Sequence, residues 1–148
     1  MKTNIFSLLL FSLLLSSCDP YIYNIVIDNN GFKKEINFEC GKVDIWCSVM
    51  ADRQISIFQK YKLDAPVIIN PEKLEITYKG ENIKPKVYLN GIITEPIEIN
   101  SEIQIRIIID LIVKDGDILQ ANIDNFITCK EKPLGIGNIN LILVSRRK

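Results

Sequence analysis

Polar and apolar residues alternate with a period of two along much of this sequence. In residues 33–40 the apolar side chains share one phase, and charged or polar side chains occupy most of the other positions. The alternation continues over residues 43–49, and in residues 103–113 it places six aliphatic side chains on one phase. Successive side chains of a strand point to opposite faces, so this period is typical of strands with one buried face. The pattern therefore predicts an all-β fold.

Shorter runs with the same alternation predict further strands over residues 21–27, 54–59, 73–79, 86–90, 97–100 and 138–145. Residues that tolerate positive φ separate the runs and predict turns at Asn29-Asn30-Gly31, Gly41-Lys42, Lys79-Gly80-Glu81-Asn82, Asn90-Gly91 and Asp115-Gly116. This spacing of turns is typical of a β-sandwich or a barrel. We expect a single immunoglobulin-like antiparallel β-sandwich of about seven to nine strands. The likeness is architectural, because the adjacent Trp46 and Cys47 do not match the Cys…Trp…Cys spacing of antibody domains.

The first residues have the pattern of an export signal. After Met1-Lys2, residues 5–15 form an apolar run that is broken only by two serines. A helix of this length rises about 16 Å, roughly half of the hydrocarbon core of a bilayer. It matches the apolar region of a secretory signal peptide better than a membrane span.

The apolar run ends in Leu15-Ser16-Ser17-Cys18, which resembles the lipobox of bacterial lipoproteins. This resemblance implies that residues 1–17 are a cleaved signal peptide and that residues 18–148 form a domain anchored by acyl chains on Cys18. More than one acyl chain gives stable attachment to a membrane. The expected location is therefore the bacterial cell envelope, with the inner and the outer membrane both open. A signal peptide cleaved near Ser16 or Ser17, which would release a soluble protein, is the alternative.

The composition is rich in Ile, Asn and Lys, and in this respect the chain resembles small lipoproteins of the Bacteroidota. Residues 18–148 resemble these lipoproteins only in composition and in the expected small immunoglobulin-like sandwich.

Composition and charge argue against several classes of activity. The chain contains no histidine, which removes Ser-His-Asp and Cys-His catalysis and His-ligated zinc. Lys+Arg and Asp+Glu both number 18, and this balance does not suit a nucleic-acid-binding protein. The acidic pairs Glu35 and Glu39, and Asp110 and Asp124, fit the solvated faces of strands and turns. We expect a protein that is not an enzyme and holds no cofactor or metal ion.

Three cysteines remain beside Cys18, and the envelope permits disulfides. A two-residue turn at Gly41-Lys42 would separate Cys40 from Cys47 by more than a disulfide can span, whereas a looser loop would allow them to pair. A bond from Cys129 to either one would tie the late part of the chain to the first hairpin. Buried free thiols also fit the sequence.

Three hypotheses for the function follow. The first is a lipid-anchored module for protein interaction or tethering in the envelope, with an envelope protein as its partner; the small lipoprotein of type VI secretion systems resembles this chain in architecture. The second is a module that binds a glycan or small ligand by stacking on Trp46, Tyr78 and Tyr88, which requires the three rings to share an exposed surface. The third is an immunity or inhibitor protein that neutralises a toxin or hydrolase in the envelope.

Overall fold

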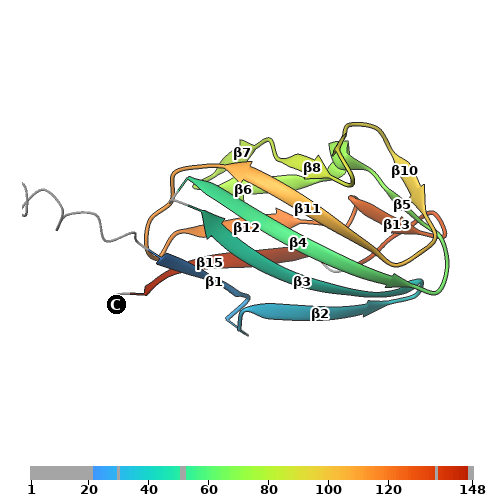
Figure 1. The fold of residues 1–148 in the computed structure, drawn as a ribbon, viewed down its shortest axis with the longest axis horizontal. Coiled ribbons are helices and arrows are strands. Elements are labelled where there is room, and N and C mark those ends of the chain that lie inside the picture. Colours follow the sequence, from blue (N-terminus) through green and yellow to red (C-terminus); the bar gives the residue numbers. More distant parts are fainter. Residues whose placement is uncertain (1–21, 30, 51–52, 136, 147–148) are drawn as a thin grey trace, which may run out of the picture.

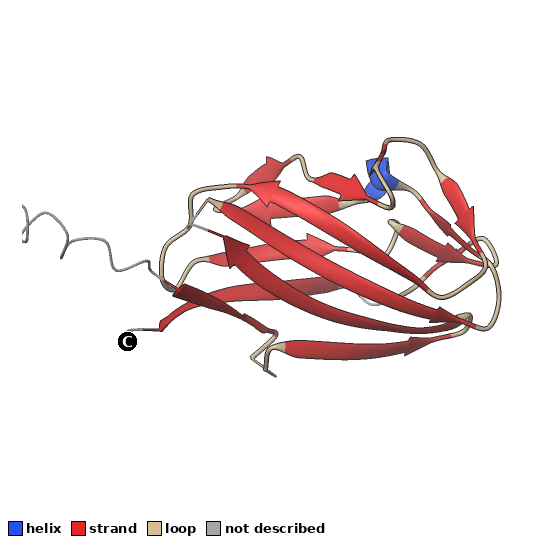
Figure 2. Ribbon diagram, viewed as in Figure 1, coloured by secondary structure: helices blue, strands red, loops and turns tan. Residues whose placement is uncertain are grey.

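Strands make up most of the fold (Figure 2). The computed structural model describes residues 22–29, 31–50, 53–135 and 137–146. Over these residues the chain forms fifteen strands and one short 3-10 helix, Pro71–Lys73. Neighbouring strands pair in antiparallel fashion throughout. The predicted all-β fold is confirmed.

A six-stranded sheet forms one layer of the sandwich. Its strands, in spatial order, are β2 (Lys33–Phe38), β3 (Gly41–Met50), β4 (Gln54–Leu63), β11 (Ile103–Asp110), β8 (Lys86–Tyr88) and β9 (Ile92–Ile93). Ten residue pairs join β3 to β4, and eight join β4 to β11. These three long strands form the continuous centre of the layer.

A five-stranded sheet forms the second layer, behind β3, β4 and β11 in Figure 1. Its strands, in spatial order, are β1 (Ile22–Ile27), β15 (Asn138–Arg146), β12 (Ile118–Asn122), β6 (Glu75–Tyr78) and β7 (Glu81–Ile83). A smaller four-stranded sheet consists of β10 (Ile97–Ile99), β5 (Val67–Ile69), β13 (Ile127–Cys129) and β14 (Lys132–Pro133).

The core lies between the sheets and is built mainly from aliphatic side chains of alternating strand residues. Its members include Ile25, Ile27, Val43, Ile45, Ile55, Ile57, Ile76, Ile105, Ile107, Ile109, Leu119, Ile139, Leu141 and Leu143. Removing this apolar surface from water supplies the main stabilisation. The side chains of Gln59 and Tyr61 on β4 are also buried in the core. There the Tyr61 hydroxyl donates a hydrogen bond of 2.6 Å to Gln59 Oε1. The buried polar groups thus satisfy each other.

The sandwich is elongated, and its two ends differ (Figure 1). At the end named here the β1 end, β1 begins, β15 finishes, and residues 111–117 connect β11 to β12. At the opposite end, named the disulfide end, residues 39–40 connect β2 to β3 near β13. The long strands of both layers run between these ends.

Two details of the predicted fold are wrong. The structure has more strands than the expected seven to nine, because the alternation does not reveal short strands such as β5, β12 and β13. The first hairpin turns at residues 39–40, whereas the sequence suggests Gly41-Lys42. Gly41 instead opens β3 opposite Leu63, where a Cβ would lie 2.2 Å from the Lys62 carbonyl oxygen. The glycine is therefore required by the close approach of β4.

Other turns follow the prediction. Positive φ angles occur at Lys79, Asn90 and Gly116, within three of the predicted turns. The immunoglobulin-like character of the sandwich stays a prediction. The predicted signal peptide, residues 1–17, and Cys18 lie outside the described residues, and within the described ranges no helix is long and apolar enough to cross a bilayer.

Candidate binding surface on the six-stranded sheet

One row of paired residues crosses all six strands of the six-stranded sheet. The register places the members of this row side by side, in the order Lys33, Trp46, Phe58, Arg106, Tyr88 and Ile92. Their sequence neighbours Ile45, Ile57 and Ile107 are buried in the core. Because successive side chains of a strand alternate between faces, the row lies on the outer face of the sheet. We call it the cross-strand row.

The centre of the cross-strand row is a stack of three side chains. The rings of Trp46 and Phe58 are nearly parallel, with 5.4 Å between their centroids and 9° between their planes. The guanidinium carbon of Arg106 lies 5.6 Å from the centroid of the Phe58 ring. Since β3 and β11 flank β4 on opposite sides, Trp46 and Arg106 approach Phe58 from its two sides. Both faces of the Phe58 ring are therefore covered within the protein.

Arg106 is held in place by a neighbouring strand. Its Nε and Nη2 atoms donate hydrogen bonds of 3.2 and 2.9 Å to the Oγ atom of Ser56, which is buried on β4. Among the ion pairs of the described residues, none involves Arg106. The guanidinium is thus oriented but keeps an uncompensated charge on the outer face, where it can bind an acceptor from another molecule.

A second row, beside the first, supplies polar groups. In it Glu35, Asp44, Lys60 and Gln104 are paired across four strands. The Asp44 carboxylate is 3.1 Å from Lys33 Nζ, and this hydrogen bond keeps the pKa of Asp44 below its usual value despite an opposing contribution from burial. Its Oδ1 atom is buried and has no hydrogen-bond partner among the described residues. The Asp44 carboxylate is thus held by Lys33 through one oxygen, and its other oxygen is closed off from the outer surface.

The structure brings together two of the three rings that the sequence suggests for ligand stacking. Trp46 and Tyr88 lie in the cross-strand row and are half-buried. Tyr78 lies on β6 of the other large sheet, where it packs against the core and its hydroxyl donates a hydrogen bond of 2.6 Å to Asp117 Oδ2. It cannot share a surface with the other two.

Sequence reasoning missed Phe58 and Arg106, which complete the row. Phe58 carries a recognisable signal, because it is an aromatic residue on the polar phase of β4, beside the buried Ile57. Arg106 carries none, since a charged residue on the polar phase of β11 is what a solvated strand face requires.

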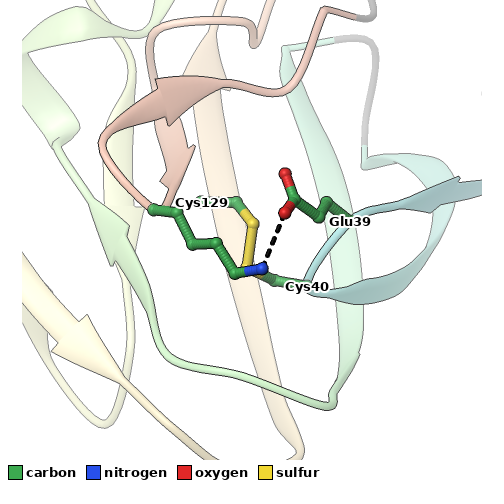
Figure 3. Close-up of a disulfide and its surroundings, with 4 residues drawn as sticks. Glu39, Cys40 and Cys129 are labelled. Atoms are coloured by element: carbon green, nitrogen blue, oxygen red, sulfur yellow. Dashed lines mark hydrogen bonds and ion pairs between the residues drawn. A yellow bond between two sulfur atoms is a disulfide. The ribbon is translucent and has the colours of Figure 1, made fainter.

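Of the three cysteines among the described residues, two form a disulfide (Figure 3) and the third is a free thiol. Cys40, in the turn between β2 and β3, is bonded to Cys129 of β13, with 5.9 Å between the Cα atoms. Cys47 is free and packs against the core, and burial raises its pKa to about 12. A thiol with such a pKa is almost entirely protonated at neutral pH and is a poor nucleophile.

The acidic pairs named in the sequence analysis could serve acid–base chemistry only as carboxylates set apart from ordinary surface contacts. Three of the four form ordinary ion pairs at the surface. Glu35 pairs with Lys42 at 3.0 Å, and Glu39 pairs with Lys130 at 2.6 Å, as Figure 3 shows for the second pair. Asp110 accepts hydrogen bonds from Lys86 and Gln54. The lysine partners lower the pKa values of Glu39 and Asp110. A general acid needs the opposite shift.

The fourth carboxylate, Asp124, binds the backbone: its Oδ1 atom accepts a hydrogen bond of 2.7 Å from the Gly137 amide. Within the described ranges, histidine, cysteine and acidic side chains nowhere form a group of three or more that could hold a metal ion.

The structure also has a shallow hollow of about 390 Å³ near the 3-10 helix. It is lined by Ile68, Asn70, Lys73, Glu75, Asn125 and Thr128. Its single carboxylate has no acidic neighbour in this lining, so the hollow does not contain the carboxylate pair that glycoside hydrolysis uses. The cross-strand row is the more distinctive surface.

Comparison with protein-family models, with curated protein sequences and with solved structures found no match to this chain. The proposed function therefore rests on the residues described above.

Proposed function

We propose that this chain is a lipid-anchored protein of the bacterial envelope that binds a partner protein and has no catalytic role. The proposed anchor is Cys18, supported by the sequence Leu15-Ser16-Ser17-Cys18. The proposed docking surface is the cross-strand row. The observation that carries the proposal is the stack of Trp46, Phe58 and Arg106 on the outer face of the sheet.

The composition of the row suits a protein partner. Tryptophan, tyrosine and arginine are the residues that most often dominate the binding energy of protein interfaces. The row contains all three types and ends at the exposed Ile92. Its rings and its guanidinium are pre-ordered by stacking and by Ser56, which lowers the entropy lost on binding.

Site-specific photocrosslinking in cells tests this proposal. A photoreactive residue at Ile92, at the end of the row, is expected to capture one recurrent envelope protein at comparable stoichiometry. The same residue at Gln120, exposed on the outer face of the five-stranded sheet, is the control and should capture only background. Identical products from both positions would argue against the row as a docking surface.

Substitutions in the row sharpen the test. Trp46→Ala and Tyr88→Ala are expected to weaken partner binding by about 2 kcal/mol or more each, as central interface residues do. Gln120→Ala is the control and should bind as the unsubstituted protein does. Affinity is measured with purified partner by calorimetry, and circular dichroism checks that each variant is folded. Unchanged affinity in both row variants would contradict the assignment.

Binding of a glycan is the second candidate, and the place of Trp46 and Tyr88 in one row on the outer face favours it. The stacking surface expected for it is incomplete, however, because Tyr78 lies on the other large sheet. Fluorescence of Trp46, which is the only tryptophan of the chain, reports such binding directly. Saturable quenching by envelope polysaccharides, lost in Tyr88→Ala, with no protein captured at Ile92, would favour the glycan over the protein partner.

The identity of a captured protein separates tethering from inhibition. A structural component of an envelope complex supports a tether. A toxin or hydrolase, with its activity lost on binding, supports the immunity or inhibitor hypothesis.

The anchor is tested separately by detergent phase partitioning. The full-length protein is expected in the detergent phase and Cys18→Ala in the aqueous phase, because the variant cannot be acylated. Cys47→Ala keeps Cys18 and is the control. A Cys18→Ala protein that still partitions with detergent would show that the lipobox interpretation is wrong. Density-gradient separation of membranes then distinguishes inner from outer membrane.

A further inference from the structure

The β1 end of the sandwich exposes an unusual share of aliphatic surface. Of the seven large hydrophobic side chains that are exposed among the described residues, four lie at this end. They are Met50, Ile112, Ile118 and Val144, with exposed fractions of 60%, 69%, 50% and 41%. Met50 ends β3 in one layer, Ile118 begins β12 in the other, and Ile112 lies in the connection between the layers. The exposed aliphatic side chains thus surround the tip of the molecule.

Ile112 is held in its exposed position by an ordered loop. The next residue, Val113, is buried in the core. The Asp117 carboxylate accepts a hydrogen bond of 2.8 Å from the Lys114 amide, and the Gly116 amide donates one of 2.8 Å to the Leu143 carbonyl of β15. The loop is therefore closed by one hydrogen bond across its turn and bound to β15 by the other. Ile112 is thus exposed on an ordered loop, next to the other exposed aliphatic side chains of this end.

The sequence before β1 limits how far this end can be from a membrane. Only three residues, 19–21, separate Cys18 from Ile22, the first residue of β1. Four residue steps span at most about 14 Å when fully extended. If Cys18 carries acyl chains, as proposed above, the beginning of β1 must lie within this distance of the lipid surface.

We propose that the β1 end docks on the bilayer that holds Cys18, with Ile112 inserted among the lipids. This inference rests on the proposed lipid anchor and adds a second contact to it. Exposed aliphatic side chains at a membrane-facing tip bury apolar surface in the interfacial region. The short connection keeps the β1 end close to the bilayer, and the Ile112 side chain is the part of this end that enters the lipid.

The charges around the tip suit anionic headgroups. Arg53 and Lys114 are exposed there and take part in none of the ion pairs formed by the described residues. The nearby carboxylates of Asp110 and Asp117 are paired with Lys86 and Lys79 at 2.9 and 3.2 Å, and the carboxylate of Asp115 accepts a hydrogen bond of 2.6 Å from the Ser145 amide. Basic side chains next to a lipid surface are attracted by anionic lipids.

The docked orientation leaves the proposed binding surface free. The long strands run from the β1 end to the disulfide end (Figure 1), so they rise away from the bilayer. The cross-strand row, whose members pair in the middle of β4 and β11, then faces sideways above the membrane.

Fluorescence of the lipidated full-length protein in vesicles of phosphatidylethanolamine and phosphatidylglycerol tests the docking. Ile112→Cys is labelled with an environment-sensitive dye, and Ile68→Cys, exposed on β5 near the disulfide end, is the matched control. In the acylated protein the native cysteines do not compete for the label, because Cys18 is modified, Cys40 and Cys129 are bonded, and the Cys47 thiol is buried.

The dye at position 112 is expected to shift its emission to the blue, to be quenched by spin-labelled lipids and to be protected from aqueous iodide. The dye at position 68 should show the reverse. Equal iodide quenching at both positions, without lipid quenching at 112, would overturn the docking. Flotation of the protein with the vesicles is measured in the same sample. A protein that fails to float would overturn both the anchor and the docking, whereas one that floats with iodide-accessible position 112 would overturn the docking alone.

A longer connection separates insertion from mere proximity. A flexible Gly/Ser insertion after Asp19 removes the constraint of the short connection and leaves residues 22–148 unchanged. Quenching of position 112 by lipids should persist, because the other exposed aliphatic side chains of the tip, Met50, Ile118 and Val144, and the basic Arg53 and Lys114 have their own affinity for the bilayer. Its complete loss would show that the tip is held near the lipid only by its connection and does not insert.

Discussion

The two ends of the sandwich are closed by different chemistry. At the disulfide end, Cys40 and Cys129 form a covalent bond, and the adjacent Glu39 and Lys130 form an ion pair across the same gap (Figure 3). At the β1 end, hydrogen bonds to aspartates hold the connection between β11 and β12. Asp115 accepts one of 2.6 Å from the Ser145 amide, for example. One end is fixed by a cross-link and the other by polar contacts at the edge of an exposed aliphatic tip.

The two ends join different sheets. Cys40 lies in the turn between two strands of the six-stranded sheet, and Cys129 belongs to the four-stranded sheet. No strand pairing among the described residues joins these two sheets, so the disulfide adds a covalent link between them. At the β1 end, residues 111–117 run from the six-stranded to the five-stranded sheet and are held by local hydrogen bonds.

The largest expected effect comes from removal of the disulfide. Cys40→Ala with Cys129→Ala should lower the free energy of unfolding by about 2–5 kcal/mol, because the bond closes a long loop in the unfolded chain. The bond spans 89 residues of sequence. Denaturant unfolding of residues 19–148 measures the loss, and hydrogen exchange should locate the loosening at the disulfide end. Cys47→Ala keeps the bond and should cost less. An unchanged unfolding midpoint would contradict the importance of this cross-link.

The sequence predicts the long strands well and the short ones poorly. β2, β3, β4, β11 and β15 each have several alternations with one buried face, so their period is visible without a structure. β5 and β13 contain three residues each, which is too few to define a period. The same limit explains why the predicted number of strands is too small.

The cross-strand row illustrates why a surface is harder to predict than a strand. Trp46 and Tyr88 are visible as aromatic residues, but their place in one row depends on the register of three successive strand pairs. A shift of one residue in any pair would move a member to the other face. The disulfide is a similar case, because the sequence allows Cys129 to pair with Cys40 or with Cys47, and only the three-dimensional fold decides for Cys40.

A smaller effect is expected at the β1 end, where Asp117 connects three elements. Its carboxylate accepts hydrogen bonds from the Tyr78 hydroxyl at 2.6 Å and the Lys114 amide at 2.8 Å, and it pairs with Lys79 at 3.2 Å. Asp117→Asn should lower the free energy of unfolding by about 1–2 kcal/mol at neutral pH, since it removes the charge from these bonds. Asp115→Asn, which affects one backbone hydrogen bond, is the control. Equal losses in the two variants would contradict a special role of Asp117.

The pH dependence of stability provides an independent check on Asp117. Burial acts to raise the pKa of this carboxyl, but its hydrogen bonds with Tyr78, Lys114 and Lys79 outweigh burial and lower the pKa below the ordinary value of 3.8. The unfolded state then binds the proton more readily than the folded state. Its contribution is fully present above the ordinary pKa and is lost as the pH falls through the lower folded value. Asp117→Asn should therefore flatten the acid limb of the stability curve, measured by denaturant unfolding, and an unaltered limb would contradict this.

The smallest expected effect is that of the ion pair beside the disulfide. Glu39 and Lys130 are both exposed, and a pair in water gains little because solvent screens the charges and two long side chains lose freedom. The hydrogen bond from Lys130 lowers the pKa of Glu39, but this shift at the surface does not amount to a strong constraint on the fold. Glu39→Gln should leave the melting temperature within the scatter of replicate measurements, as should the exposed control Glu98→Gln. A loss close to that of the disulfide variant would mean that the ion pair closes this end as much as the covalent bond does.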